Sequence, residues 1–544
     1  MGHALHVLRG RSLVQHEAGP AVMLPYRQVA RSHRRRDYPW GVQVAGLDSI
    51  DHVVLVMLEN RSFDHMLGFL YPKSGDFDGL DGTESNADAA GNEATVFRIT
   101  ADMQNAYYFP LANPTEGYQA SNDQLFSSDA PPASGEAAND GFVTSFATEL
   151  QHPAHPLDPK LAGAEPASIM GMYAAETLPV LSGLATGFAV CDGWFSSLPT
   201  QTFPNRAFAV AGTSLGYTDN SARGVPAFNT PSVFGRLADA GQTWKIYGYS
   251  ADPLTSHDFP DTVTPGPNGE VVAGFARFQS DAANGELAAF SYIEPEWATH
   301  PRRQPPPAGA PAGDQHNFHV ENDQHPVSNL AVGEKLLYDV YQALRNGPAW
   351  EKTLLIITYD EHGGNYDHVH PPTGAIPPDD VIGASGFDFT RFGVRVPAVL
   401  VSPLIPEGTI LHAPTDGRPP FDHTSIIATL RARFGIGALG QRDAAAPDVG
   451  PVLTLPTPRT DDPLAAIGPP TAADPVLQAG SPPVGAAPSS FLEAKALAAA
   501  ALPVPTDPIA DPQAMVKTLS TAADQYTFIQ QRRAAWRAAG RPLK

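Results

Sequence analysis

Short apolar runs separated by polar stretches dominate the chain from about residue 50 to residue 435. The run at 53–58, VVLVML, is apolar at every position, which is typical of a strand that is buried on both faces of a sheet. Runs of the same kind predict further strands at 187–191, 242–249, 289–294, 353–360 and 394–402.

Stretches with helical spacing of apolar residues lie between several of these strands. In 331–346 the spacing of Leu336, Val340 and Leu344 predicts a helix, and 424–434 predicts another. Strands that alternate with helices over this length predict an α/β fold, with a mostly parallel sheet that is covered by helices on both faces.

The flanking regions differ in composition from this core. Residues 1–48 predict an irregular leader, 49–440 a single large domain, and 441–544 a Pro- and Ala-rich tail. The end of the tail, 513–539, predicts an amphipathic helix that packs on the domain. Within the domain, 77–160 is rich in Gly, Ala, Asn, Asp and Pro, which indicates a long insertion over one edge of the sheet.

Charge and cysteine content narrow the function classes. The net charge of the 544-residue chain is -22, which argues against a nucleic-acid binder because such proteins need a basic surface. It does not argue against a phosphate substrate, since a bound metal ion can dominate the local field. Cys191 is the only cysteine, so neither an internal disulfide nor a cysteine zinc cluster can form.

No run of about 18 or more apolar residues is present, so we expect no transmembrane helix and at most peripheral contact with a membrane. The first residues include positive charges but no apolar run of the length that a signal peptide needs. We therefore expect a cytoplasmic protein by default, with secretion or periplasmic export by an unmarked route as the alternative. The sequence predicts no oligomeric state.

Polar side chains follow two of the predicted strands at the point where each strand ends. Glu59 and Asn60 follow the first run, and the strand predicted at 353–360 ends in acids, Asp360 and then Glu361. Adjacent acids in a loop are usually just solvated, but acids that directly end a buried strand are costly unless a cation pairs with them. The carboxyl edge of the sheet is also where open α/β folds place their chemistry. We therefore expect a metal site there.

Thr202 lies where a helix is expected to begin, because Pro204 follows it closely and proline is tolerated in the first helical turn. A hydroxyl at the start of a helix faces free N–H groups, which suits attack on a phosphate. The alternative is that Thr202 simply caps the helix.

Histidines provide further candidates. His325 lies with Asp323 in ENDQHP, His423 lies in FDHTS, and His368 follows the second acidic pair. A single histidine is more often a surface or core residue than a catalyst, and the chain has 18 of them. Taken one at a time, these residues therefore predict little.

Five motifs together say more than any of them alone. ENRSFDHMLG, TQTFPNR, NDQHP, YDEHGGNYDHVHPP and FDHTSI occur in this order, over roughly residues 50–435. In this the chain resembles the bacterial and plant phospholipase C / acid phosphatase family, a branch of the alkaline-phosphatase superfamily. The resemblance implies a three-layer α/β/α sandwich with a central, mostly parallel sheet, and makes 49–440 a phosphoesterase catalytic domain.

The resemblance also implies roles for individual residues. Residues that match the metal ligands are Glu59, Asn60, Thr202, Asp360 and Glu361. Thr202 additionally matches the nucleophile, and His325 and His423 match histidines beside the phosphate. Asp323, Asn205 and His368 are expected at the substrate, with the alternative that Asn205 only shapes the turn. Arg206 is expected to be structural. Because all the metal ligands are oxygens, one Ca²⁺, Mg²⁺ or Mn²⁺ ion is favoured over Zn²⁺.

The expected activity is hydrolysis of a phosphate ester through a phospho-threonine intermediate. A phospholipase C acting on head-group diesters, with an apolar approach to its site, competes with an acid phosphatase, whose site should be closed and polar. A catalytically silent binding protein is the third alternative. A sulfatase is excluded because Cys191, in CDGWF, does not fit the sulfatase motif. His152, His155 and His257 are unassigned candidates for the substrate pocket.

Overall fold

The computed structural model describes residues 46–540, except for 129, 132–135, 154–160, 162, 222, 302–317, 385 and 471–487. Nearly all of the predicted leader, and also His155, therefore lie outside the described residues. Residues 44–544 group into one compact unit. No helix in the described part of the chain has both the length and the apolar character needed to cross a bilayer.

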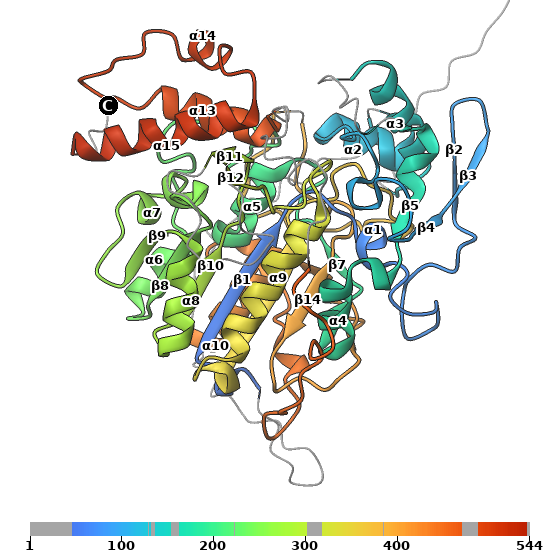
Figure 1. The fold of residues 1–544 in the computed structure, drawn as a ribbon, viewed down its shortest axis with the longest axis horizontal. Helices are drawn as coiled ribbons and strands as arrows, with labels where there is room; N and C mark the ends of the chain where they lie inside the picture. The colour runs from blue at the N-terminus through green and yellow to red at the C-terminus, as the bar shows by residue number, and fades with distance from the viewer. Residues whose placement is uncertain are drawn as a thin grey trace, which may run out of the picture. The chain divides into compact units, whose positions relative to one another are not determined.

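A central sheet organises this unit. Its eight strands are β1 (His52–Leu58), β6 (Ala189–Cys191), β8 (Trp244–Gly248), β9 (Gly269–Ala273), β10 (Phe290–Ile293), β13 (Thr353–Tyr359), β14 (Ala398–Val401) and β15 (Thr409–Leu411). They lie in the order β15-β6-β14-β13-β1-β10-β8-β9 (Figure 1). All neighbours are parallel except β14, which is antiparallel to both β13 and β6.

Each predicted strand region contains one strand of this sheet. The strand predicted at 187–191 begins later, because helix α4 (Pro179–Gly187) continues into it. β9 and β15 were not predicted. Both lie at the edges of the sheet and are mostly half-buried, so they lack the continuous apolar run that marks the central strands.

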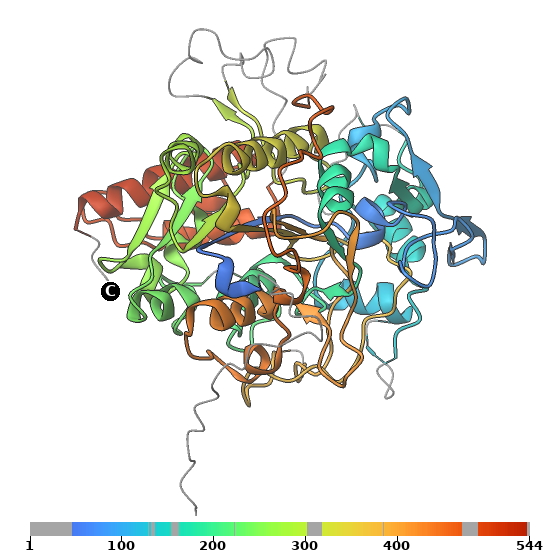
Figure 2. The ribbon, with the colours of Figure 1, turned by 90° about the horizontal axis from the view of Figure 1, so that it is seen from below.

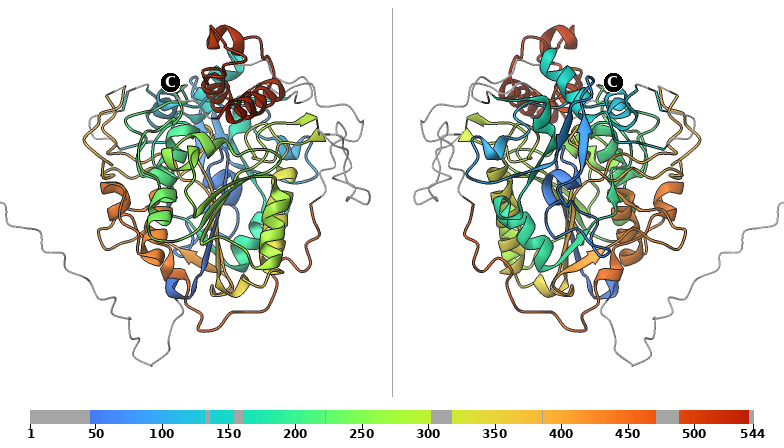
Figure 3. Two further views of the ribbon diagram at one scale, coloured as in Figure 1. Left: turned by 90° about the vertical axis from the view of Figure 1, so that its left-hand side faces the viewer. Right: turned by 90° about the vertical axis from the view of Figure 1, so that its right-hand side faces the viewer.

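Helices cover both faces of the sheet, which confirms the predicted three-layer α/β/α fold (Figures 2 and 3). On one face, α4 and α8 (Phe275–Asn284) both pack against α9 (Leu330–Arg345). On the other face, α6 (Val233–Asp239) and α10 (Thr424–Phe434) both pack against α5 (Thr202–Ala211). The helices predicted at 331–346 and 424–434 are α9 and α10.

The region predicted as an insertion contains ordered elements. They are α2 (Tyr118–Phe126), α3 (Phe142–Gln151), β2 (Ser85–Ala87), β3 (Glu93–Thr95) and β4 (Phe97–Ile99). β4 pairs with β5 (Gly171–Tyr173), and a separate apolar cluster that includes Phe142, Phe146 and Met172 packs the region. Near it lies α1 (Phe63–Leu67), which follows β1 (Figure 1).

The C-terminal part contains more helix than predicted. α11 (Gln441–Ala445) and α13 (Ser490–Ala500) were not expected, and the helix predicted at 513–539 is two helices, α14 (Pro512–Val516) and α15 (Ala522–Ala538). The break occurs because Thr521 caps α15 by accepting a hydrogen bond from the Asp524 N–H. α13 packs against α15, and its Lys495 forms a buried ion pair with Asp258 of the main domain.

The remaining short elements are α7 (Pro260–Val263) and the strand pairs β7 (Trp194–Phe195) with β16 (Phe421–Asp422) and β11 (His300–Pro301) with β12 (Phe318–His319).

Candidate active site

The two acidic strand ends meet at the carboxyl edge of the sheet. β1 and β13 are parallel neighbours in which Leu58 lies opposite Tyr359, so the residues that follow also lie side by side. The Asn60 N–H donates to Asp360 Oδ1 at 3.0 Å. The side chains of both pairs, Glu59 with Asn60 and Asp360 with Glu361, are buried. This confirms the expectation that the two strand ends would come together.

The backbone conformations of Asn60 and Gly363 allow the segments after β1 and β13 to approach each other closely. Asn60 has φ 56°, a left-handed conformation that asparagine tolerates better than most residues. Gly363, also at positive φ, lies against it, and a Cβ at this position would come within 2.3 Å of the Asn60 carbonyl oxygen. Only glycine therefore allows this approach.

Arg206 lies between the two carboxylates. Its Nε is 3.1 Å from both Glu59 Oε1 and Asp360 Oδ2, and its Nη2 donates to the backbone carbonyls of Met57 and Leu58. Burial raises the pKa of Glu59 well above its usual value, and Asp360 adds to this. Burial also opposes ionisation of Asp360, but Arg206, together with hydrogen bonds from Glu59 and from neighbouring backbone N–H groups, outweighs burial and lowers the pKa of that carboxyl. The guanidinium of Arg206 thus compensates the negative charge of the Asp360 carboxylate.

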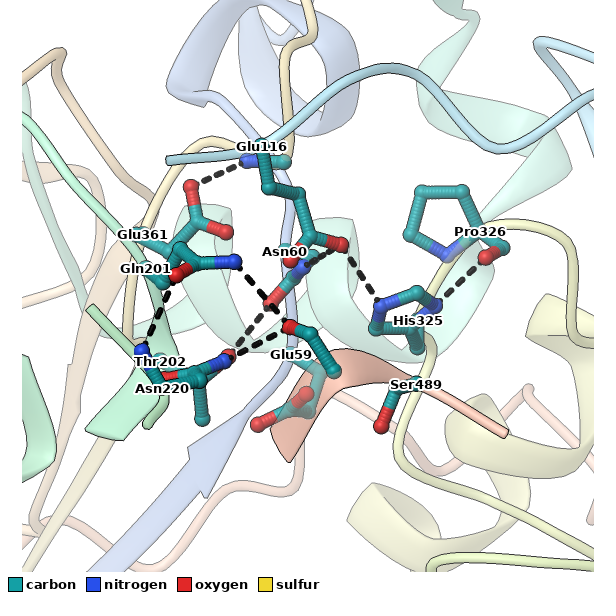
Figure 4. Close-up of polar contacts among 12 residues, drawn as sticks. Glu59, Asn60, Glu116, Gln201, Thr202, Asn220, His325, Pro326, Glu361 and Ser489 are labelled. Atoms are coloured by element: carbon teal, nitrogen blue, oxygen red, sulfur yellow. Dashed lines mark hydrogen bonds and ion pairs between the residues drawn. The ribbon is translucent and has the colours of Figure 1, made fainter. Parts of the chain in front are cut away.

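Thr202 is the first residue of α5, after Gln201 as the N-cap. The hypothesis that Thr202 caps the helix is therefore wrong. Its buried hydroxyl instead donates to Asn60 Oδ1 at 3.3 Å (Figure 4). Helix α5 thus brings a hydroxyl from the opposite side of the site to the end of β1.

Glu361 has a buried carboxylate oxygen without a partner. Its Oε2 accepts from the Gly363 N–H at 2.7 Å, whereas its Oε1 has no hydrogen-bond partner in the protein. Burial, followed by the nearby charges of Glu116 and Asp360, raises the pKa of Glu361 well above its usual value. A buried acceptor of this kind is costly unless something outside the chain satisfies it.

Glu116 belongs to the site but carried no signal in the sequence. It lies just before α2, in the insertion, and its Oε1 accepts from Asn60 Nδ2 at 2.8 Å. The same oxygen lies 3.0 Å from His325 Nε2, so Glu116 connects the end of β1 to the histidine loop (Figure 4).

His325 is held from both ring nitrogens. Nδ1 donates to the Pro326 carbonyl at 2.5 Å, which turns Nε2 towards Glu116. Burial opposes a charge on the imidazole, but Glu116 and then Asp323 outweigh it and raise the pKa of His325. Asp323 accepts from the His325 N–H, and its own carbonyl accepts from the Glu59 N–H. His325 and Asp323 therefore lie beside the strand ends, as predicted.

His423 is placed differently. Its Nε2 donates to the backbone carbonyl of Asp360 at 2.6 Å, and its Nδ1 accepts from Trp194 Nε1 at 3.3 Å. The short pairing of β7 with β16 brings these segments together. Because both ring nitrogens bind protein groups, the geometry of His423 is that of a residue that positions Asp360 rather than one that contacts a phosphate.

Asn205 also binds only backbone in this structure. Its Oδ1 accepts from the Leu198 N–H, and its Nδ2 donates to carbonyls of the turn that precedes α5. Of the two roles expected for Asn205, these contacts favour shaping of the turn over binding of substrate.

His368 lies in a second buried cluster. Its Nδ1 is 2.7 Å from Asp64 Oδ2. In the described part of the chain, Asp64, Asp367 and His368 are the one group of three or more acidic, histidine or cysteine side chains whose ligand atoms all lie within 4.8 Å of one another. This group could hold a metal ion. However, Arg395 already pairs with both carboxylates, at 2.8 and 3.1 Å. None of the three residues of this group is among the five metal ligands that the sequence predicts.

A hydrogen-bond network links the first turn of α5 to helix α13. Ser490, the first residue of α13, accepts from Gln201 Nε2 at 3.1 Å and from Asn220 Nδ2 at 2.8 Å. Asn220 Oδ1 in turn accepts from the Phe203 N–H at 2.7 Å. The ring of Phe491 packs edge-on against Phe203, with 5.5 Å between centroids. The first turn of α5 is therefore fixed partly by a segment that the sequence predicted to be a tail.

A cavity of about 1130 Å³ adjoins these residues, and Glu116 and Gln201 form part of its wall. The acidic residues that line it are Asp88, Glu93, Glu116, Asp123, Asp140 and Asp219. Among its described lining residues there is no lysine or arginine. The approach to the site is thus wide but acidic and polar, rather than apolar.

Two of the unassigned histidines lie elsewhere. His152 ends α3, and its exposed side chain is not among the lining residues of the cavity. His257 is buried under α15, where its ring lies 5.4 Å from that of Trp536.

Comparison with known proteins identifies the family. The Phosphoesterase family matches residues 50–437, which include both strand ends, α5 and the histidine loops. The chain belongs to this family. It is therefore a phosphoric ester hydrolase, and the prediction made from the five motifs is confirmed.

Curated relatives of this phosphoesterase include plant and bacterial enzymes. Non-specific phospholipase C3 of Arabidopsis thaliana is 34% identical over 435 residues, which cover 76% of this chain and 75% of the plant protein. Non-specific phospholipase C1 of the same plant is 33% identical, over 73% of this chain and 69% of its own length. Phospholipase C B of Mycobacterium tuberculosis is 29% identical, over 76% and 79% of the two chains.

Solved structures similar to the phosphoesterase include the phosphonate monoester hydrolase of Agrobacterium radiobacter, with 16% identity over 51% of this chain and 72% of that one and a TM-score of 0.29. A protein in the alkaline phosphatase superfamily from Vibrio parahaemolyticus is 14% identical over 49% and 64% of the two chains, with a TM-score of 0.28.

Proposed function

We propose that this phosphoesterase is a metal-dependent phospholipase C that cleaves head-group diesters through a phospho-threonine intermediate on Thr202. The observation that carries the proposal is the convergence of three chain segments, which bring Thr202 to the strand end that holds Glu59 and Asn60 and place Asp360 beside that end. The relatives named as phospholipases C support the choice of substrate.

The chemistry of the proposed donor set suits one divalent cation. Glu59, Asn60, Thr202, Asp360 and Glu361 offer only oxygen, which suits Ca²⁺, Mg²⁺ or Mn²⁺ and leaves Zn²⁺ less favoured. Glu361 Oε1 is buried without a partner, and Arg206 neutralises only part of the carboxylate charge. When bound, the ion would supply positive charge that favours the alkoxide form of Thr202 and offsets charge on the phosphoryl oxygens.

The residues of the chain would then act in sequence. The Thr202 hydroxyl gives its proton to solvent water as its oxygen attacks phosphorus, while the bond from phosphorus to the diacylglycerol oxygen breaks. His325, which Glu116 and Asp323 favour in its protonated form, gives a proton to the leaving oxygen. Water then attacks the phospho-threonine: one proton of that water returns to His325, and the Thr202 oxygen takes a proton from solvent as the phosphorylated head group is released. We assign Asp323 to orienting His325, and His423 to orienting Asp360.

The cavity favours a diester over a monoester. It has room for a head group next to Glu116, and its acidic wall would repel the doubly charged phosphate of a monoester more than the singly charged phosphate of a diester. The apolar approach expected of a phospholipase C is not found, because the cavity wall is acidic and polar, but neither is the closed site expected of an acid phosphatase.

Turnover of two soluble chromogenic substrates tests the proposal. We expect p-nitrophenyl phosphorylcholine to be cleaved faster than p-nitrophenyl phosphate. Thr202→Ala should lose turnover and the acid-stable phosphoprotein that can be trapped with substrate, whereas Thr202→Ser should keep part of both. Full activity of Thr202→Ala would contradict the assignment of the nucleophile, and a preference for the monoester would favour the phosphatase. If the wild-type protein cleaves neither ester, the result would favour the alternative of a catalytically silent binding protein.

A further inference from the structure

Three exposed apolar side chains stand out on the surface. Tyr217, Val381 and Ile382 are 40%, 44% and 60% exposed, and they are the strongly exposed large hydrophobic residues in the described part of the chain. Single exposed apolar residues need no explanation, but a group of them indicates a contact surface. We call these three residues the apolar patch.

The members of the apolar patch come from two neighbouring loops. A side chain added at Gly216 would come within 2.6 Å of Val381 Cγ1, so the residue before Tyr217 lies directly against Val381. Thr213 Oγ1 also donates to Asp379 Oδ2 at 3.0 Å, which ties the bases of the two loops together.

The same two loops form part of the cavity wall. Thr218 and Asp219, which follow Tyr217, line the cavity, and so does Ala384, two residues after Ile382. The apolar patch therefore lies at the entrance through which a substrate would reach Glu116 and Gln201.

Aromatic contacts connect the patch to the nucleophile helix. The ring of Tyr217 packs edge-on against Phe228, which packs edge-on against Phe203, the residue after Thr202. The Arg223 guanidinium lies 4.0 Å above the Tyr217 ring and 4.6 Å from that of Phe203. A surface that held Tyr217 would thus be fixed in orientation relative to the site.

The negative charges around the apolar patch determine which type of lipid surface the patch could contact. Asp379 and Asp380 precede Val381, Asp219 follows Tyr217, and the whole chain carries a net charge of -22. Anionic lipids would be repelled, whereas a zwitterionic bilayer accepts aliphatic side chains in its acyl region and tyrosine at its headgroup level.

We propose that Tyr217, Val381 and Ile382 insert into the surface of a zwitterionic phospholipid bilayer and bring the cavity entrance to the headgroups. This inference rests on the proposed phospholipase function. With only three side chains inserted, binding is weak and reversible, comparable to that of a single acyl anchor.

Vesicle binding and soluble turnover together test the inference. Val381→Asp/Ile382→Asp should reduce binding to phosphatidylcholine vesicles at least tenfold in a flotation assay, and should reduce vesicle hydrolysis likewise. Turnover of soluble p-nitrophenyl phosphorylcholine should stay within twofold of wild type, because neither residue belongs to the catalytic cluster. Ala276→Asp/Gln279→Asp, which adds the same charge at exposed positions of α8, should bind as wild type does.

Several results would overturn the inference. Equal binding of both double variants and wild type would do so, as would stronger binding of wild type to phosphatidylglycerol vesicles. If light scattering showed a wild-type dimer that becomes monomeric in the patch variant, the patch would instead be an interface between copies. Failure of wild type to cleave the soluble diester would reject the proposed function, while the flotation result would still decide on the patch.

Discussion

The Nε of Arg206 lies 3.1 Å from Asp360 Oδ2, deep in a site where the remaining charges are mostly negative. The sequence indicated a structural role for this arginine, and its contacts show what that role is. Its guanidinium pairs directly with the carboxylates of Glu59 and Asp360, which end the two strands.

Replacement of Arg206 by methionine should therefore destabilise the protein strongly. Removing one member of a buried ion pair leaves the other unpaired, and we expect the free energy of unfolding to fall by about 3–5 kcal/mol. Chemical denaturation measures this change, with Arg418→Met, at an exposed ion pair with Asp416, as the control that should cost less than about 1 kcal/mol. Equal losses in the two variants would contradict the special role of Arg206.

Divalent ions should stabilise the protein more as the pH rises. The pKa values of Glu59 and Glu361 are raised in the fold, mainly by burial, so their contribution to stability is complete below about pH 4.5 and is lost as the pH rises through their folded pKa values. A bound cation would offset that loss. We expect the increase in Tm on adding Mg²⁺, Ca²⁺ or Mn²⁺ to an EDTA-treated sample to grow between pH 5 and pH 8.

The matched variant for that experiment is Glu361→Gln, which keeps the shape of the side chain but removes a ligand charge. It should bind the ion more weakly and show a smaller, less pH-dependent increase in Tm. An increase in Tm that is the same at every pH, or unchanged in Glu361→Gln, would speak against a metal at the strand ends.

Ser490→Ala should lower kcat while leaving KM nearly unchanged. The hydroxyl accepts from Gln201 and Asn220, which fix the first turn of α5, whereas Ser490 itself does not line the cavity where a head group would bind. We expect a loss of roughly threefold to thirtyfold in kcat, which corresponds to about 0.7–2 kcal/mol.

Two comparisons separate this positioning role from a loss of stability. Ser490→Thr keeps the hydroxyl and should restore most of kcat, whereas Ser489→Ala removes the cap of α13 and should lower Tm more than kcat. If both alanine variants lose kcat in proportion to Tm, the network is only structural.

His368 should make stability depend on pH in the alkaline range. Burial opposes its charge, but Asp64, with Asp78 and Asp367, outweighs this and raises its pKa from 6.5 to about 10. Its contribution is therefore complete below pH 6.5 and is lost as the pH rises through about 10. The difference in unfolding free energy between wild type and His368→Gln should be about 2–4 kcal/mol at pH 6 and should vanish above pH 10. A difference that does not change with pH would show that His368 is neutral in the fold.

Most of the sheet could be predicted because its central strands are buried on both faces and therefore read as continuous apolar runs. β9 and β15 were missed since edge strands keep one side partly open and lose that signal. The direction of β14 was not predictable either, because an apolar run does not encode whether its neighbours are parallel.

The site was predictable to the extent that its residues follow strands or begin helices. The polar pairs that follow β1 and β13 indicate the carboxyl edge of a sheet. Because the two strands are parallel neighbours with Leu58 opposite Tyr359, the two pairs lie side by side. The position of Glu116 could not be predicted in this way, because Glu116 lies in an insertion whose path depends on tertiary packing. His423 was recognisable in a motif, but only its partners, Trp194 and the Asp360 carbonyl, reveal what it holds.

The contact between Gln201 and Ser490 spans 289 positions of the chain. During synthesis, the sheet, both acidic pairs and Thr202 itself leave the ribosome long before Ser490 does. The first turn of α5 acquires its last hydrogen-bond partner only when α13 arrives, so a nascent chain would carry Thr202 in an incomplete hydrogen-bond network. A helix that is made so late would delay full activity until α13 has been synthesised.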